Sequence, residues 1–147
     1  HGKPVITATQ MLESMIENPF PTRAEVSDVY NSVMQRTDAV MLSGETAAGK
    51  YPVKSVKMMS STILEAEKNI AALHRDFSAD GLTSRDIEKK ALIKSAIYSA
   101  EELGVAGLFI FTKSGKLARL ASAFRPNLPI YAFTPHLDSV AYMNVLY

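Results

Sequence analysis

The pattern of hydrophobic and polar positions divides the first half of the chain into strand, helix, strand and helix. Residues 4–8 are short, partly β-branched and begin at a proline, which is typical of a buried strand. Thr22 stands three residues before Glu25, a spacing that predicts a capping box and a helix after it. Residues 39–42 predict a second buried strand, and a polar loop follows at 43–46.

Two apolar stripes at helical spacing predict the two helices of this half. The first stripe contains Val26, Val29, Tyr30, Val33 and Met34. The second helix begins at Pro52, because a missing N–H costs nothing in the first turn. We expect it to run to about Leu73, with a buried face made of Val53, Val56, Met59 and Ile63.

The second half predicts a different α/β arrangement after an aperiodic polar stretch at 74–84, which we interpret as a linker. Thr83 or Ser84 caps a long helix that Gly104 ends. Further on, the pattern predicts strands at 106–111 and 129–133 and helices at 116–124 and 137–145. Strand, short helix and strand with tight connections indicate a parallel βαβ unit with a right-handed crossover.

Composition narrows the class of protein. The chain has 147 residues, of which 47% are hydrophobic and 21% charged, as in globular proteins. Its net charge is +1, so we predict neither a nucleic-acid partner nor a membrane surface as partner. There is no cysteine, which excludes a thiol nucleophile and a cysteine-bound metal. Two βα units cannot close a barrel, which takes eight, so we expect this chain to be an excerpt of a longer protein.

Hydroxyl and carboxylate side chains follow the first two predicted strands. Thr9 follows one strand, and Ser43 and Glu45 follow the next. In parallel α/β folds ligands bind at the carboxyl ends of the strands, which makes these residues candidates for chemistry. The alternative is that Thr9 and Ser43 cap the helices after them and that Glu45 interacts with a helix dipole.

A third polar loop, between a strand and a helix, predicts an anion site. It contains Thr112, Lys113, Ser114, Gly115 and Lys116. Hydroxyls, ammonium groups and the free N–H groups of a helix start together attract phosphate. The alternative is an ordinary turn in which Ser114 is the N-cap.

The histidines predict no metal site. His1, His74 and His136 are too scattered along the sequence to form one.

Long motifs in both halves resemble pyruvate kinase. Residues 3–15 resemble the family's seventh-strand segment, 18–26 its next helix, and 38–47 its eighth strand and loop. This similarity runs from residue 2 to roughly 70. Residues 111–115 and 125–126 resemble the family's C-terminal domain, in the expected order.

The resemblance implies a fold and an activity. The fold class would be α/β: an incomplete TIM-barrel segment of two βα units at 1–75, a linker at 76–84, and part of the allosteric α/β domain at 85–147. The full-length enzyme would transfer phosphoryl from phosphoenolpyruvate to ADP in glycolysis, as a cytoplasmic homotetramer using Mg²⁺ and K⁺. The ligands of both ions would lie outside this segment, so the segment alone is expected to be inactive. The alternative function is a non-catalytic phosphate-binding regulatory module.

The resemblance also implies roles for individual residues. Thr9 matches a threonine beside the pyruvate methyl group, in the relay that protonates enolpyruvate. Ser43 and Glu45 match positions on the same rim that steady this relay and its waters. Many family members have a lysine where Ala48 stands, so we predict no nucleotide contact in this segment. The nearest ammonium is that of Lys50, which is expected to point elsewhere.

The third loop resembles the family's sugar-phosphate loop, whose pattern is Thr-x-Ser-Gly-x-Ser/Thr. Thr112, Ser114 and Gly115 match, while Leu117 stands in place of the final hydroxyl. If the loop binds the phosphate group of an allosteric effector, its affinity is therefore expected to be weaker than in the fructose-bisphosphate type of loop, or its preference for the effector altered.

Overall fold

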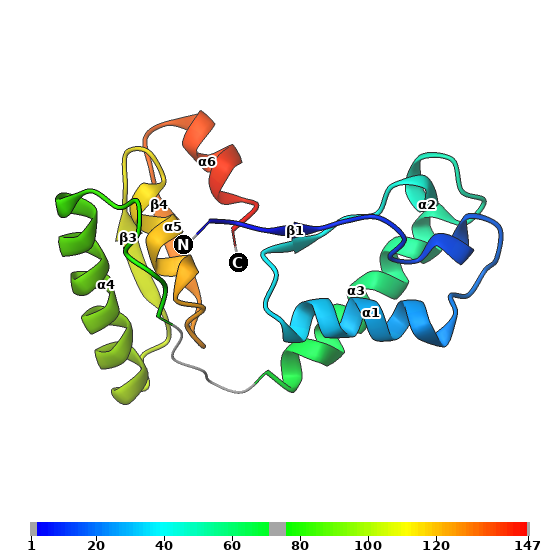
Figure 1. Ribbon diagram of the computed structural model, residues 1–147, viewed down its shortest axis with the longest axis horizontal. Coiled ribbons are helices and arrows are strands. Elements are labelled where there is room, and N and C mark those ends of the chain that lie inside the picture. Colours follow the sequence, from blue (N-terminus) through cyan, green and yellow to red (C-terminus); the bar gives the residue numbers. More distant parts are fainter. Residues whose placement is uncertain (1–2, 71–75, 147) are drawn as a thin grey trace. The chain divides into compact units, whose positions relative to one another are not determined.

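The computed structural model describes residues 3–70 and 76–146. The chain divides into an N-terminal unit, Val5–Ala71, and a C-terminal unit, Ala72–Tyr147 with His1–Pro4 (Figure 1). Each unit has its own hydrophobic core.

The N-terminal unit contains two βα repeats. Its elements are β1 (Ile6–Thr7), the 3₁₀ helix η1 (Glu13–Ile16), α1 (Arg23–Met34), β2 (Ala39–Val40), α2 (Gly44–Ala47) and α3 (Pro52–Lys68). The strands pair in parallel, with Ile6 opposite Ala39 and Thr7 opposite Val40 (Figure 1). Both predicted strands are present but shorter than expected. They were predicted to be buried, and this is wrong for Ile6, which is 51% exposed. In the described residues only two strands form this sheet.

The start of α1 follows the sequence prediction. The Thr22 hydroxyl accepts a hydrogen bond from the Glu25 backbone N–H at 3.3 Å, and the Glu25 carboxylate accepts one from the Thr22 N–H at 2.7 Å. The predicted capping box is therefore confirmed. Behind it, the unit's core contains Met11, Leu12, Met15, Val29 and Met59.

The buried face of α3 differs from the prediction. Pro52 is the first helical residue, as expected. The buried residues are Ser55, Met59, Thr62 and Ala66, whereas Val53 and Val56 are 66% and 52% exposed. The helix ends at Lys68, earlier than predicted, and Leu73 lies outside the described residues.

The predicted polar loop at 43–46 is also wrong. Gly44–Ala47 forms the short helix α2, with Ser43 immediately before it. Glu45, in the first turn of this helix, is buried. Its carboxylate finds backbone donors inside the unit, which removes the penalty for burying it.

The C-terminal unit contains the predicted parallel βαβ arrangement. Its elements are α4 (Ser84–Glu102), β3 (Leu108–Phe111), α5 (Lys116–Ala123), β4 (Ile130–Phe133) and α6 (Leu137–Met143). The strands pair in parallel, with Leu108 opposite Ile130 and Phe111 opposite Phe133. The predicted caps of α4 are confirmed: the Thr83 hydroxyl accepts from the Asp86 N–H, and Gly104 leaves the helix with a φ of +61°. That conformation favours glycine.

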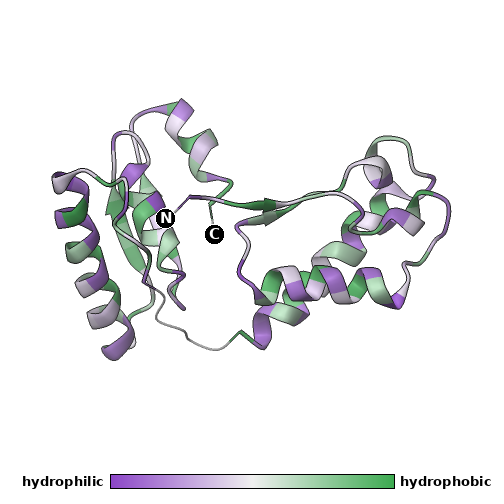
Figure 2. Cartoon of the chain, viewed as in Figure 1, coloured by the Kyte–Doolittle hydropathy of each residue, from purple (hydrophilic) through white to green (hydrophobic). Residues whose placement is uncertain are grey.

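The sheet of this unit has one packed face and one open face. Ile110 packs with α4 and α5 side chains in a core that includes Ile93, Ile97, Leu120 and Phe124. The alternating residues Phe109, Phe111, Tyr131 and Phe133 stack on each other and are all exposed. Figure 2 shows both strands as hydrophobic along their length.

The described part of the predicted linker, 76–83, contains no helix or strand but is not free chain. Asp76 forms ion pairs with Lys90 and Lys94, at 2.7 and 2.6 Å. Those two ammonium groups hold the pKa of Asp76 well below its ordinary value. The Phe77 ring packs on Phe124 with the centroids 4.9 Å apart. The segment is thus attached to this unit, with Phe77 packed against its core, and the predicted linker residues 74–75 lie outside the described chain.

Candidate functional site

The carboxyl ends of β1 and β2 bring two exposed hydroxyl residues onto one rim. Thr9 follows β1 and Ser43 follows β2, and the strands are paired directly. The helix-capping alternative is wrong for Thr9, because the N-cap of η1 is Leu12. Ser43 does occupy the N-cap position of α2, but its side chain makes no capping hydrogen bond, so its hydroxyl is not used by the helix.

The backbone at Thr9 is strained. Thr9 and Gln10 have φ values of +70° and +53°, in the left-handed region that favours glycine. Each such residue costs of order 1 kcal/mol or more and persists only where surrounding contacts fix it. Such strain gathers at functional sites, which makes the rim a candidate site on geometric grounds as well.

Glu45 joins the two loops of the rim from beneath. Its Oε1 accepts a hydrogen bond from the Leu12 N–H at 3.0 Å, and its Oε2 accepts one from the Ser43 N–H at 2.8 Å. The side chain is 3% exposed. Leu12 belongs to the loop after β1, so one carboxylate fixes the backbone of both loops. A helix-dipole interaction alone would not require these two bonds.

These bonds also set the charge of Glu45. Burial raises the pKa of the carboxyl, but the backbone N–H groups of Glu45 itself, Ser43 and Leu12 outweigh it and lower the pKa below its ordinary value. Glu45 is therefore ionised at neutral pH, with both oxygens engaged by the backbone. This makes it suited to holding the rim rather than to transferring a proton.

The chain after α2 packs closely against η1. A Cβ atom on Gly49 would lie 2.6 Å from the Glu45 carbonyl oxygen in α2 and 3.2 Å from the Ile16 Cα in η1, so only glycine fits there. The next residue, Lys50, donates its backbone N–H to the Ile16 carbonyl at 2.8 Å. Its ammonium group donates a hydrogen bond to the Glu17 carboxylate, and this bond, together with the charge of Glu17, raises the pKa of Lys50. The Lys50 side chain is thus held at the surface by its ion pair with Glu17.

Sequence reasoning missed part of what Glu25 does. The capping box accounts for its contacts with Thr22, but the carboxylate also accepts from the backbone N–H and the hydroxyl of Ser14, in η1. No local spacing signals a bond between residues eleven positions apart.

The second candidate site is the loop between β3 and α5. The Lys113 carbonyl accepts hydrogen bonds from the hydroxyls of Thr134 and Ser139, both at 3.0 Å. Gly115, with a φ of +73°, is the residue before α5. The alternative in which Ser114 is the N-cap is therefore wrong.

The ammonium of Lys116 in this loop has a carboxylate partner. Lys116 Nζ lies 2.7 Å from Asp86 Oδ2, and Asp86 is buried. This ion pair, with the Thr83 hydroxyl, lowers the pKa of Asp86 to about 2. Of the two lysines of the loop, Lys116 is thus charge-compensated by α4, while Lys113 is exposed.

The described residues do not fit a metal site. Residues 3–70 and 76–146 contain no group of three or more His, Cys, Asp or Glu side chains that could hold a metal ion. Both oxygens of Glu45, the buried acid of the rim, already accept backbone hydrogen bonds.

Comparison with known proteins identifies the family. Residues 1–56 match the family "Pyruvate kinase, barrel domain", and residues 90–147 match "Pyruvate kinase, alpha/beta domain". The chain belongs to the pyruvate kinase family. The α/β fold class is thereby confirmed, since both matches fit a barrel segment followed by part of an α/β domain.

Curated relatives in this family come from distant organisms. The chain is 50% identical over 138 residues to pyruvate kinase of Geobacillus stearothermophilus, and the aligned region covers 90% of this chain and 22% of that protein. It is 44% identical over 150 residues to pyruvate kinase 1 of Trypanosoma brucei brucei, covering 98% of this chain and 29% of that protein. Isozyme A of Ricinus communis, named as chloroplastic, is 48% identical over 137 residues, covering 90% of this chain and 24% of that protein.

The chain thus spans less than a third of the length of these relatives. Among the described residues, no helix is both long and apolar enough to cross a membrane.

Proposed function

We propose that this chain acts as part of a pyruvate kinase that transfers phosphoryl from phosphoenolpyruvate to ADP, giving pyruvate and ATP in glycolysis. The family membership supports this reaction, and the geometry of the rim at the ends of β1 and β2 supports a role of the rim residues in it. One observation carries the assignment: two exposed hydroxyls stand at the ends of paired parallel strands, above a buried carboxylate that binds both loops. A free-standing regulatory module would have no use for this rim.

Thr9 would act in the proton step. After phosphoryl transfer, enolpyruvate must gain a proton at its methylene carbon, and a positioned hydroxyl can deliver it directly or through water. The left-handed backbone at Thr9 supports this role, because it fixes where the hydroxyl stands. Ser43 would hold the relay's waters from the neighbouring loop, and Glu45 would position both loops through the Leu12 and Ser43 N–H groups.

Magnesium and potassium would be bound by parts of the enzyme other than the residues described here. The rim does not fit a metal, since no described cluster offers the ligands and Glu45 is fully occupied by backbone donors. Phosphoryl transfer depends mainly on charge neutralisation by cations, so the chain by itself would have essentially no turnover. We further propose a cytoplasmic homotetramer for the complete enzyme, with residues 1–75 in its barrel, 85–147 in its allosteric domain, and 76–84 as a connection that packs on the latter through Phe77.

The loop Thr112–Lys116 would bind the phosphate of an allosteric effector. The N-terminus of α5 and the exposed Lys113 and Ser114 side chains support this, whereas the Lys116–Asp86 ion pair weakens the positive charge available to a phosphate. Together with Leu117 in place of a hydroxyl, the pair favours weak binding.

The experiment is the substitution Thr9→Val in the full-length enzyme. Valine keeps the shape of threonine and removes the hydroxyl. An interaction made only in the transition state appears in kcat, so we expect kcat to fall while the KM for phosphoenolpyruvate changes little. An unchanged kcat with a raised KM would instead place Thr9 in substrate binding.

A further inference from the structure

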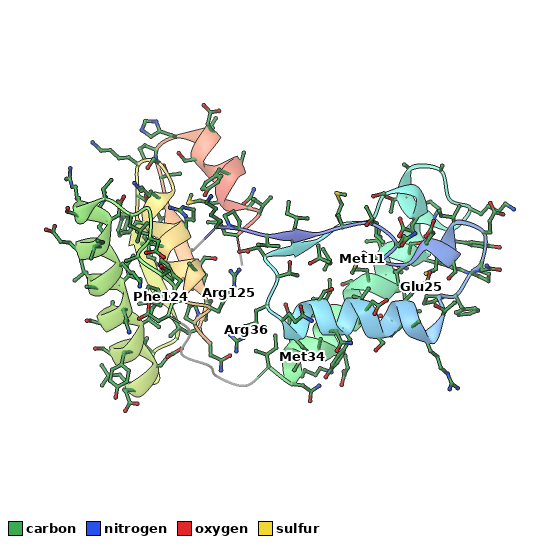
Figure 3. The ribbon with its side chains drawn as sticks, viewed as in Figure 1. Met11, Glu25, Met34, Arg36, Phe124 and Arg125 are labelled. Carbon is green, nitrogen blue, oxygen red and sulfur yellow. The ribbon has the colours of Figure 1, made fainter. Side chains whose placement is uncertain are left out.

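The loop that carries Thr9 is also held by Glu25, in the first turn of α1. Glu25 Oε1 accepts from the Ser14 N–H at 2.7 Å, and Oε2 accepts from the Ser14 hydroxyl at 2.5 Å. Oε2 also accepts from the N–H and hydroxyl of Thr22, at 2.7 and 2.9 Å. Figure 3 labels Glu25 and Met11 within this unit. One carboxylate therefore binds four donors from two separate segments.

Capping explains only half of these bonds. A capping box requires the contact between Glu25 and the N-cap Thr22. Ser14 lies eight residues before that cap, in η1, so its two bonds do nothing for the start of the helix. They tie the loop after β1 to α1 instead. Burial raises the pKa of Glu25, but the Ser14 and Thr22 donors outweigh it and lower the pKa, so that the group is charged at neutral pH.

The tie acts on a strained backbone. Before the strained pair, β1 is fixed by its pairing, with the Thr7 carbonyl accepting from the Met41 N–H at 2.9 Å. After Thr9 and Gln10, the chain is fixed by Glu45 at Leu12 and by Glu25 at Ser14. A left-handed threonine relaxes to ordinary backbone unless both sides hold it.

We propose that Glu25 is a positioning residue of the reaction, which fixes through Ser14 the loop backbone that holds the Thr9 hydroxyl in place. The inference rests on the role proposed above for Thr9. It differs from the role of Glu45, which binds the two rim loops to each other, because Glu25 binds the Thr9 loop to α1.

The test is a double-mutant cycle in the full-length enzyme, with Glu25→Gln, Thr9→Val and both together. Glutamine keeps the shape but offers one acceptor oxygen in place of two. Misplacing a catalytic group by about 1 Å costs up to about a hundredfold in rate, and we expect Glu25→Gln to lower kcat about tenfold with a nearly unchanged KM. In the Thr9→Val background the same change should have no further effect on kcat, because Glu25 acts through Thr9. Glu17→Gln, which breaks the exposed pair with Lys50, is the matched control and should leave kcat unchanged.

Two hydroxyl deletions separate positioning from helix capping. Ser14→Ala and Thr22→Ala each remove one hydroxyl donor to Glu25. They also test the proposal if the Glu25→Gln variant does not fold. Ser14→Ala should lower kcat, whereas Thr22→Ala should lower the melting temperature and leave kcat unchanged.

The inference is overturned by an unchanged kcat in Glu25→Gln, by independent effects that multiply in the double variant, or by equal losses of kcat in Ser14→Ala and Thr22→Ala. A distinct result, loss of kcat in Glu25→Gln but not in Thr9→Val, would refute the proposed role of Thr9.

Discussion

Replacing Glu45 by glutamine should both destabilise the N-terminal unit and slow the enzyme. The carboxylate offers one oxygen to the Leu12 N–H at 3.0 Å and the other to the Ser43 N–H at 2.8 Å. Glutamine keeps one acceptor oxygen, and its amide nitrogen is a donor. One of the two backbone N–H groups must then face another donor in a site that is 3% exposed.

The magnitude follows from the bond that is lost. A hydrogen bond to a charged group contributes about 1.5–3 kcal/mol. A neutral amide is less costly to bury than a carboxylate, so we expect the lower end, about 1.5 kcal/mol of unfolding free energy. The assay is urea unfolding of the full-length enzyme followed by circular dichroism, with kcat measured on the same samples. The loops of Thr9 and Ser43 lose their common tie, so kcat should fall as well.

The control and the pH dependence make this prediction specific. Glu65→Gln breaks an exposed i,i+3 pair with Lys68 on α3 and should cost less than about 0.5 kcal/mol. The folded-state pKa of Glu45 is lowered, so its stabilisation is present above the ordinary value of about 4.3 and is lost as the pH falls through the folded pKa. The difference in unfolding free energy between the wild type and Glu45→Gln should therefore decrease below about pH 4.3. Equal unfolding free energies for Glu45→Gln and Glu65→Gln at pH 7 would refute the reasoning.

Three further predictions concern other parts of the chain. The Asp86–Lys116 pair should stabilise the C-terminal unit above about pH 4, and this stabilisation should be lost toward pH 2, because the pKa of Asp86 is lowered to about 2. Asp86→Asn should remove this pH dependence from thermal unfolding curves. The isolated 147-residue chain should associate, because Ile6 on β1 and Val5 just before it are 51% and 57% exposed; a sharp monomer peak in size-exclusion chromatography with light scattering would contradict this. Phosphorylated sugars should activate the full-length enzyme only weakly, and Ser114→Ala should weaken the response further; a low-micromolar response to fructose 1,6-bisphosphate would be inconsistent with a weakened loop.

Local signals in the sequence were sufficient for the starts of α1 and α4 and for the end of α4. Thr22 and Thr83 cap α1 and α4 as their spacing predicts, and Gly104 ends α4, because each of these bonds joins residues within a few positions of each other. Likewise, the parallel βαβ unit follows from element order and short connections.

The buried face of α3 could not be found in the same way. Its buried row is Ser55, Met59, Thr62 and Ala66, which has helical spacing but contains only two apolar residues. The hydroxyls of Ser55 and Thr62 donate to carbonyls four residues earlier, at 3.0 and 2.9 Å, so these small side chains pack without an unpaired polar group. Which face a helix buries is decided by its neighbour, and a hydrophobic stripe alone does not reveal it.

The location of the candidate site was predicted from the sequence, but the hydrogen bonds that hold it together were not. Thr9 and Ser43 are found at the strand ends where parallel topology puts them. The two carboxylates accept hydrogen bonds across eleven and thirty-three residues, Glu25 from Ser14 and Glu45 from Leu12. Such long-range bonds are fixed by the folded loop, and they leave no periodic signal in the sequence.

The most direct test of the central claim measures proton exchange at the pyruvate methyl group. In the reverse of the proposed step, the full-length enzyme with ATP removes a methyl proton from pyruvate, so deuterium from heavy water enters that group. If Thr9 belongs to the proton relay, Thr9→Val should slow deuterium incorporation at least as strongly as it lowers kcat, while pyruvate still saturates the enzyme at a similar concentration. Incorporation at the wild-type rate in Thr9→Val would contradict the claim.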